Sequence, residues 1–297
     1  MIKVSGVTKS FDGFKALDGV DINVPSGAIY GLVGPNGAGK STVIRCLMGI
    51  FKPDYGEITV DGEPVWENPA VKARIAYISD DVYYFLQATT RDMMRFYRGI
   101  YPNFDMERYK KLRYVFNIDD KRPIRRLSKG MQKQVAFWLA LSCRPELMIL
   151  DEPVDGLDPV MRRQVWSLIM SDVTEHGTTV LISSHNLREL EDVCDHVGIM
   201  NHGKMILERS LDELQDNISK VQIVLREGTD LPGNLQVLGR TDVGRVTTLI
   251  LRGNRETVTN ILATVSPLFV DVLPLTLEEI FIYELGGEDY AVKDIVL

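Results

Sequence analysis

GPNGAGKST (Gly34 to Thr42) sets the architecture expected of this 297-residue chain. It follows an apolar run, residues 28–33, and precedes a segment with helical periodicity, residues 43–48, which predicts a strand, a loop and a helix in succession. Glycines free such a loop of side-chain bulk, so backbone N–H groups can surround a polyphosphate at the helix N-terminus. The complete nine-residue string argues against the alternative, a glycine-rich turn that binds no ligand.

Each residue of this loop is therefore a predicted nucleotide contact. We expect Lys40 to reach the β- and γ-phosphate oxygens and the Ser41 hydroxyl to bind Mg²⁺. The full predicted set is Gly34, Pro35, Asn36, Gly37, Ala38, Gly39, Lys40, Ser41 and Thr42.

A second motif, LMILDEP at residues 147–153, has the pattern of a buried parallel strand that ends in two carboxylates, Asp151 and Glu152. Ligands of open α/β sheets lie at the carboxyl ends of the strands. We expect Asp151 to hold Mg²⁺ through water, and Glu152 to orient and deprotonate the water that attacks the γ-phosphorus. General-base catalysis of this kind contributes roughly 100- to 10,000-fold in rate. A solvated pair of turn carboxylates is the alternative, and the preceding phosphate loop argues against it.

Three shorter motifs complete the series. LSKGM at residues 127–131 lies so that Ser128 is 23 residues before Asp151; alone, it is equally the start of an amphipathic helix with Ser128 as its N-cap. Asp155-Gly156-Leu157-Asp158 follows the carboxylate pair, and His185 follows a second apolar strand, residues 179–183. A lone histidine after a strand is usually structural, so the order and spacing of the whole set carry the argument.

Over about residues 1–210, these motifs resemble the ATP-binding subunits of ABC transporters. The resemblance implies ATP and Mg²⁺ as cofactors and hydrolysis of ATP as the reaction. It also implies a dimer in which the signature of one subunit closes over the ATP held by the other. The residues that would make these contacts in trans are Ser128, Lys129, Gly130 and Met131, and the D-loop crossing the interface would be Asp155, Gly156, Leu157 and Asp158. Whether the second cassette is an identical copy or a paralogue stays open.

The same resemblance assigns two further residues. His185 corresponds to the switch histidine, which would hydrogen-bond the γ-phosphate and hold the attacking water together with Glu152. Phe11, 23 residues before Gly34, corresponds to the aromatic that stacks on adenine, a contact worth roughly 1–3 kcal/mol. An ordinary core phenylalanine is the alternative for Phe11. Catalysis is thus expected from Glu152, His185 and Lys40.

Three departures from the family pattern affect the site. Asp80 stands where a glutamine is usual; we expect it to keep the metal-sensing role, so that the predicted metal ligands are Ser41, Asp80 and Asp151. Lys129 and Met131 replace a glycine and a glutamine of the signature, and Asp155 replaces a serine. Residues 78–81, 101–105 and 277–281 resemble, more narrowly, a bacterial YtrB-type exporter branch.

Composition narrows the class of partner. With 34 Lys and Arg against 41 Asp and Glu, the net charge of −7 argues against nucleic-acid binding. The three cysteines have no metal-ligand spacing and are expected to be reduced packing residues. No run approaches the roughly 18–20 apolar residues that cross a bilayer, and the N-terminus has no signal-peptide pattern. We therefore expect a cytoplasmic ATPase, peripheral on the inner face of the cell membrane, that energises a separate integral-membrane permease, with export as the expected direction.

The predicted fold class is α/β: a P-loop NTPase cassette followed by a small α+β domain. The cassette spans residues 1–211, with an antiparallel β subdomain, a RecA-like parallel core and a helical subdomain at about residues 82–140. Residues 212–297 form an accessory or regulatory domain whose role the sequence does not specify. Residues 91–133 hold 13 Lys and Arg but only 5 Asp and Glu. This segment is either a solvated surface or a face toward the anionic inner leaflet.

The rival interpretation is a soluble ABC ATPase that acts on ribosomes or nucleic acid. In the DNA-repair type, a long coiled coil separates the phosphate loop from the signature, whereas this chain has 88 residues from Lys40 to Ser128 and no sustained heptads. In the translation type, two cassettes share one chain, and this sequence contains one. Both features favour the transporter.

Overall fold

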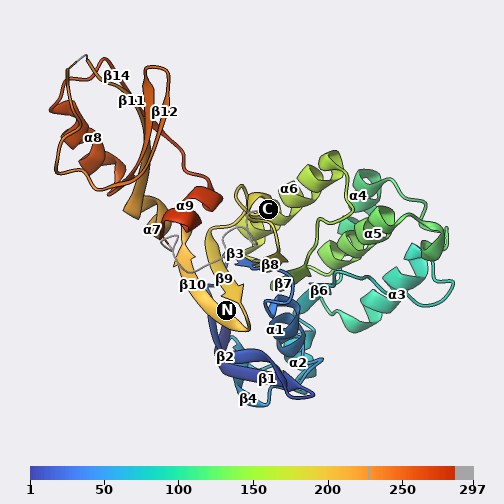
Figure 1. The fold of residues 1–297 in the computed structure, drawn as a ribbon. Coiled ribbons are helices and arrows are strands. Elements are labelled where there is room, and N and C mark those ends of the chain that lie inside the picture. Colours follow the sequence, from blue (N-terminus) through green and yellow to red (C-terminus); the bar gives the residue numbers. More distant parts are fainter. Residues whose placement is uncertain (227, 285–297) are drawn as a thin grey trace. The chain divides into compact units, whose positions relative to one another are not determined.

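The computed structural model describes residues 1–226 and 228–284, apart from the side chains of residues 215, 216, 280, 281 and 284. The described chain divides into two compact units (Figure 1). The first contains residues 1–185 and 193–208, and the second contains residues 186–192 and those from 209 onward. Among the described residues, no helix combines the length and apolar character needed to span a bilayer.

A six-stranded sheet with the order β10-β9-β3-β8-β7-β6 forms the centre of the first unit. Its strands are β3 (Ile29–Val33), β6 (Ile75–Ile78), β7 (Leu147–Asp151), β8 (Thr179–Ser184), β9 (His196–Asn201) and β10 (Lys204–Ser210). Every residue of β3, β7 and β8 is buried, as expected for parallel strands covered on both faces. The carboxyl ends of these three strands lead directly into the phosphate loop, Glu152 and His185.

A second, antiparallel sheet has the order β2-β1-β4-β5. It consists of β1 (Ile2–Phe11), β2 (Phe14–Val24), β4 (Tyr55–Val60) and β5 (Glu63–Pro64). Asp61 and Gly62 join β4 to β5 with φ angles of 50° and 78°, the conformation of a tight hairpin turn, for which Asp-Gly is a favoured sequence. The apolar face of this sheet shares one core with α1 (Lys40–Leu47).

Helices fill the segment between β6 and β7, and one more follows β7. They are α3 (Thr90–Ile100), α4 (Met106–Phe116), the short 3₁₀ helix η1 (Ile124–Arg126) and α5 (Lys129–Ser142), then α6 (Pro159–His176); α2 (Pro69–Lys72) precedes β6. A capping box between Thr89 and Asp92 starts α3 at residue 90, so the preceding segment from residue 82 is not helical, contrary to expectation. The Trp138 ring stacks on Tyr109 with 4.6 Å between centroids and ties α5 to α4.

The second unit has its own sheet, of order β12-β13-β11-β14, and its own core. Its elements are η2 (Leu187–Glu189), α7 (Leu211–Asn217), β11 (Ile218–Val224), β12 (Val237–Val243), β13 (Val246–Arg252), α8 (Arg255–Ala263), β14 (Phe269–Leu273) and α9 (Leu277–Glu284). The sequence did not predict β12, an edge strand in which no residue is fully buried and which therefore lacks an alternating pattern. Within this unit Arg188 donates two hydrogen bonds of 2.9 Å to the Glu278 carboxylate.

Candidate active site

The phosphate loop leaves β3 and ends at Gly39, the N-cap of α1. Gly39 has a φ of 108°, and a Cβ atom there would lie 2.9 Å from the Ala16 carbonyl oxygen, so both conformation and space require glycine. No side chain caps α1, whereas the side chains of Ser128 and Asp158 cap α5 and α6. The first N–H groups of α1 therefore remain available to an anion.

A cavity of about 350 Å³ opens over this loop. It is lined by Phe11, Phe14, Ala16, Asn36, Gly37, Ala38, Gly39, Lys40, Ser41, Thr42, Asp80 and Glu152. The structure thus brings most of the predicted loop contacts together with the predicted adenine-stacking and metal-sensing positions. The Phe11 ring packs edge-on against Phe51 at 5.1 Å and is 38% exposed, which leaves ring surface for a base.

Lys40 is buried at the floor of this cavity. Its ammonium donates a hydrogen bond of 2.6 Å to the Gly34 carbonyl and lies 3.6 Å from the Glu152 carboxylate. Burial lowers the pKa of Lys40, while the nearby carboxylates of Glu152 and Asp151 oppose that shift. An ammonium so placed can bind phosphate oxygens that enter the loop.

Asp151, at the end of β7, is 1% exposed and is bound by two hydroxyl groups. Ser41 donates to its carboxylate at 3.1 Å and Ser183 donates to the same oxygen at 2.5 Å. Carboxylate and hydroxyl oxygens are the ligands that Mg²⁺ prefers, so the donor set of Ser41 and Asp151 fits this ion. Ser183 was not among the predicted site residues, although it lies two residues before His185.

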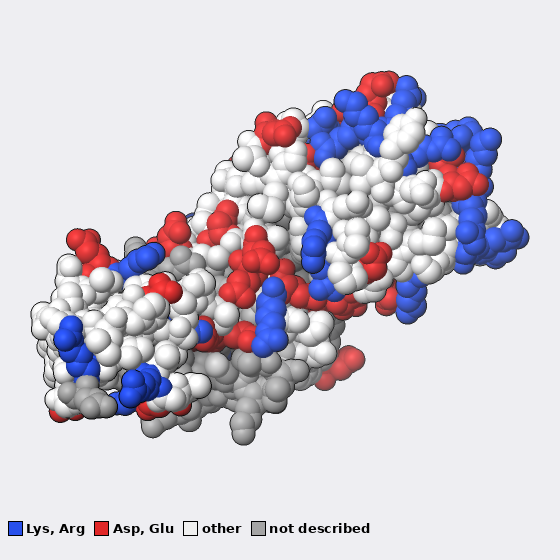
Figure 2. Space-filling model, turned by 90° about the horizontal axis from the view of Figure 1, so that it is seen from above, with Lys and Arg blue, Asp and Glu red and all other residues white. Residues whose placement is uncertain are grey.

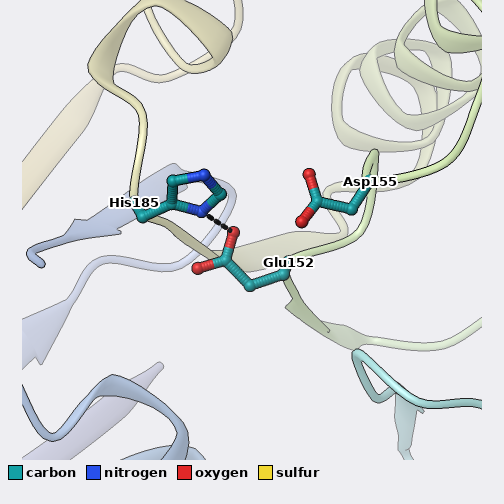
Figure 3. Close-up of side chains that lie close together, drawn as sticks. All are labelled: Glu152, Asp155 and His185. Atoms are coloured by element: carbon teal, nitrogen blue, oxygen red, sulfur yellow. Dashed lines mark hydrogen bonds and ion pairs between the residues drawn. The ribbon is translucent and has the colours of Figure 1, made fainter. Parts of the chain in front are cut away.

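Glu152 and His185 meet at the ends of β7 and β8 (Figure 3). Nδ1 of His185 lies 2.9 Å from Oε2 of Glu152. Atoms of these two side chains and of the Asp155 carboxylate all lie within 4.8 Å of one another. Burial raises the pKa of Glu152, the neighbouring Asp155 adds to the rise, and His185 and Lys40 oppose it. A carboxylate with a raised pKa is suited to accept a proton from water.

The predicted signature residues lie at the N-terminus of α5, away from the loop cavity. The Ser128 hydroxyl accepts a hydrogen bond from the Met131 N–H at 3.2 Å, as the N-cap alternative predicted. A Cβ atom on Gly130 would lie 2.4 Å from the Gly156 carbonyl, so the signature and the D-loop are in close backbone contact within one chain. Of the other predicted D-loop residues, Leu157 is buried and Asp158 caps α6.

A second cavity, of about 390 Å³, lies between these segments and the residues after β6. Its lining is Asp80, Asp81, Val82, Tyr83, Lys129, Gln132, Lys133, Asp155 and Gly156. Asp80 therefore lines both cavities. Sequence reasoning missed Lys133 and Phe14; the first is one helical turn beyond Gly130, and the second follows the Asp12-Gly13 turn that brings it back beside Phe11.

Comparisons with known proteins agree with this geometry. A family model described as ABC transporter matches residues 17–155. The ABC transporter ATP-binding protein YtrB of Bacillus subtilis (strain 168) is 32% identical over 289 residues, 97% of this chain and 99% of that protein. The daunorubicin/doxorubicin resistance ATP-binding protein DrrA of Streptomyces peucetius is 36% identical over 233 residues, 76% of this chain and 70% of DrrA. A solved ATP-binding subunit of an ABC transporter has a TM-score of 0.67 and 26% identity, over 72% of this chain and 92% of that one.

The similarity to YtrB extends beyond the cassette motifs and includes the second unit. It confirms the narrower resemblance to the YtrB branch that residues 78–81, 101–105 and 277–281 indicated. Similarity of this extent, in a chain whose phosphate loop and Glu152 line one cavity, establishes the family. The chain belongs to the ATP-binding proteins of ABC transporters and is an ATPase of that family.

Proposed function

We propose that this ATPase energises a separate membrane permease through closure of a cassette dimer around two ATP molecules. The observation that carries the proposal is the contact between His185 and Glu152 at the edge of the phosphate-loop cavity. In the proposed reaction, Lys40 binds the terminal phosphates, Glu152 accepts a proton from the attacking water, and His185 holds that water and the γ-phosphate. Export is the proposed direction, because DrrA is named as a drug-resistance protein.

Magnesium is the proposed metal. Ser41 and Asp151 would hold it, because the Ser41 hydroxyl lines the cavity beside Lys40 and donates to the Asp151 carboxylate at 3.1 Å. Asp80 lines the same cavity and would supply a second carboxylate. The ion would neutralise charge on the phosphate oxygens when bound.

A second cassette would complete each site. Ser128, Lys129, Gly130 and Met131 do not line the cavity over their own phosphate loop, which is consistent with contacts in trans. The close packing of Gly130 on Gly156 makes the signature and D-loop a single rigid edge that one cassette would present to its partner.

The permease would dock in an apolar groove of the first unit. This groove, of about 810 Å³, is lined by Met48, Glu67, Asn68, Pro69, Ala70, Lys72, Ala73, Ile75, Ile100 and Tyr101. Ile100, at the end of α3, is 50% exposed, so it presents apolar surface that a docked partner would cover. Docking here would place the cassette on the inner face of the membrane.

A basic surface lies on the same subdomain. Figure 2 shows Lys and Arg gathered over the part of the first unit that contains α3 and α4. The exposed members are Arg95, Arg98, Lys110, Lys111, Arg113, Lys121, Arg122, Arg125 and Arg126. A polybasic face gains about 1 kcal/mol per residue near an anionic leaflet, so we propose that it faces the membrane. Binding to phosphatidylserine vesicles should weaken as salt rises; binding that is insensitive to salt would contradict this orientation.

The decisive experiment is affinity purification of the tagged chain from gently solubilised native membranes, followed by mass spectrometry. We expect a stoichiometric multi-span membrane protein with the wild type, and its loss with Ile100→Asp. Val243→Asp, at an exposed position of β12, is the matched control and should keep the partner. Recovery of ribosomal or other soluble proteins alone would contradict the transporter proposal.

A further inference from the structure

A buried lysine outside the predicted site joins the hydrolysis site to Asp80. Lys133 lies in α5 and its side chain is 5% exposed. Its ammonium donates a hydrogen bond of 2.6 Å to the main-chain carbonyl of Glu152, and it lies 3.7 Å from the Asp80 carboxylate. A buried ammonium without partners is strongly unfavourable, so these two oxygen partners decide where the Lys133 side chain can lie.

The carbonyl that Lys133 binds belongs to a residue with an uncommon backbone conformation. Glu152 has a φ of 46°, in the left-handed region that residues other than glycine seldom adopt. Such conformations persist when the surroundings hold them. The Glu152 N–H donates to the Ser183 hydroxyl at 3.1 Å, so Ser183 and Lys133 hold the two polar backbone groups of this one residue. The direction of the Glu152 side chain follows from both contacts.

Asp80 lies where the two cavities of the site meet. It lines the cavity over the phosphate loop and also the cavity formed with Lys129, Lys133 and Asp155. Its side chain is 59% exposed, which leaves it room to turn toward either one. If its carboxylate turned toward a bound nucleotide and metal, Lys133 would keep the Glu152 carbonyl but lose its anionic partner.

We propose that Lys133 is a positioning residue that couples the Asp80 carboxylate to the backbone of Glu152. The inference rests on the proposed role of Glu152 as general base. Asp80 then influences hydrolysis through Lys133 as well as through metal, and the two residues act as a unit. This ion pair explains why Asp80 stands where a glutamine is usual, because a carboxylate forms an ion pair with Lys133 and an amide does not.

The first test replaces the ammonium by an apolar group of similar length. Lys133→Met should lower kcat by about 10- to 100-fold, because small displacements of a catalytic group cost this much. The Kd for ATP should stay within about twofold, because Lys133 does not line the loop cavity. Lys133→Arg should recover part of kcat, since a guanidinium can donate to the same carbonyl. Lys3→Met, at an exposed position of β1, is the control with equal charge loss.

A readout independent of turnover is hydrogen exchange of residues 151–158 in the nucleotide-free chain. Exchange there should rise in Lys133→Met and not in Lys3→Met. If Lys133→Met does not fold, Lys133→Gln takes its place, because its amide still donates to Glu152 but has no charge for Asp80. Unchanged exchange together with a kcat within twofold of the control would overturn the proposal.

The coupling itself is tested by a double-mutant cycle. Asp80→Asn should lower kcat more in the wild-type background than in Lys133→Met, because in that variant the ion pair is already broken and only the effect of Asp80 through the metal remains. Losses that simply multiply would show that the two residues act independently and would overturn the coupling. Glu152→Gln separates this failure from that of the proposed function: turnover in Glu152→Gln contradicts the general base, whereas an inactive Glu152→Gln beside a fully active Lys133→Met contradicts only the coupling.

Discussion

Nδ1 of His185 lies 2.9 Å from Oε2 of Glu152, although the two residues follow different strands and are far apart in the sequence. The contact exists because β7 and β8 are neighbours in a parallel sheet, with Asp151 in register with Ser183. The side chains that follow such a pair emerge at one edge of the sheet. The contact between His185 and Glu152 is therefore positioned by strand register.

Removing the charge of Glu152 should lower the rate of ATP hydrolysis and increase the free energy of unfolding. Glu152→Gln should bind ATP, hydrolyse it about 100- to 10,000-fold more slowly and accumulate as a dimer. The raised pKa of Glu152 means that its ionised form is unfavourable in the folded chain, so the amide should increase the free energy of unfolding at neutral pH. Urea denaturation checks the second effect, and a variant less stable than the wild type at pH 7.5 would contradict it.

The raised pKa of Glu152 also predicts how the stability of the fold and the rate of ATP hydrolysis depend on pH. Below the pKa of free glutamate, about 4.3, Glu152 is protonated in the folded and the unfolded chain, and the stability difference between Glu152→Gln and wild type should vanish. As the pH rises through the higher folded-state pKa, the wild type loses this contribution and the difference grows. Hydrolysis by the wild type should fall on the acid side at a pH above 4.3, which a pH profile of kcat for ATP measures.

Two phenylalanines are candidates for the residue that stacks on adenine. Phe11 and Phe14 both line the cavity over the phosphate loop. If Phe11 stacks on the base, Phe11→Ala should raise the Kd for ATP by roughly 5- to 150-fold, equivalent to about 1–3 kcal/mol, and Phe14→Ala should have a smaller effect. Titration with a fluorescent ATP analogue measures both. The reverse ranking would assign the stacking to Phe14.

A buried ion pair should dominate the stability of the contact between α4 and α6. Arg108 lies 2.6 Å from Asp172, whose side chain is 3% exposed. Asp172→Ala should cost about 3–5 kcal/mol, because it leaves the Arg108 charge unpaired. The double variant Asp172→Leu with Arg108→Met should recover much of this loss. Urea unfolding followed by tryptophan fluorescence measures both, and a cost below about 1 kcal/mol for the single variant would contradict the expectation.

Much of the fold and of the site could be predicted because its signals are local. Three runs of buried residues gave β3, β7 and β8, and the nine-residue phosphate loop fixed what lies at their ends. The hairpin turn at Asp61 and Gly62 could also be predicted, because Asp-Gly is a favoured pair where two successive residues need positive φ angles. The first unit could thus be assembled from short segments whose order defines their neighbours.

The other features of the fold and of the site depend on contacts between residues far apart in the sequence, and such contacts leave no local sequence pattern. Lys133 looks like a polar residue of an amphipathic helix, and only the packing of α5 against the end of β7 gives its ammonium the Glu152 carbonyl. Phe14 became a candidate only when the hairpin placed it beside Phe11. The edge strand β12 has no buried residue, so its place in the second sheet comes from pairing with β13.

The N-cap of α5 has a consequence for how the signature serine can bind an anion. Because the Ser128 oxygen already accepts the Met131 N–H, one of its lone pairs is committed and its hydroxyl hydrogen is left over. That hydrogen can point only in directions that the Met131 N–H does not occupy, so the Ser128 hydroxyl can act as a donor to a ligand outside the helix. The same hydroxyl thus begins a helix and keeps its hydrogen for a second acceptor, which in the proposed dimer would be a phosphate oxygen of the ATP held by the partner subunit.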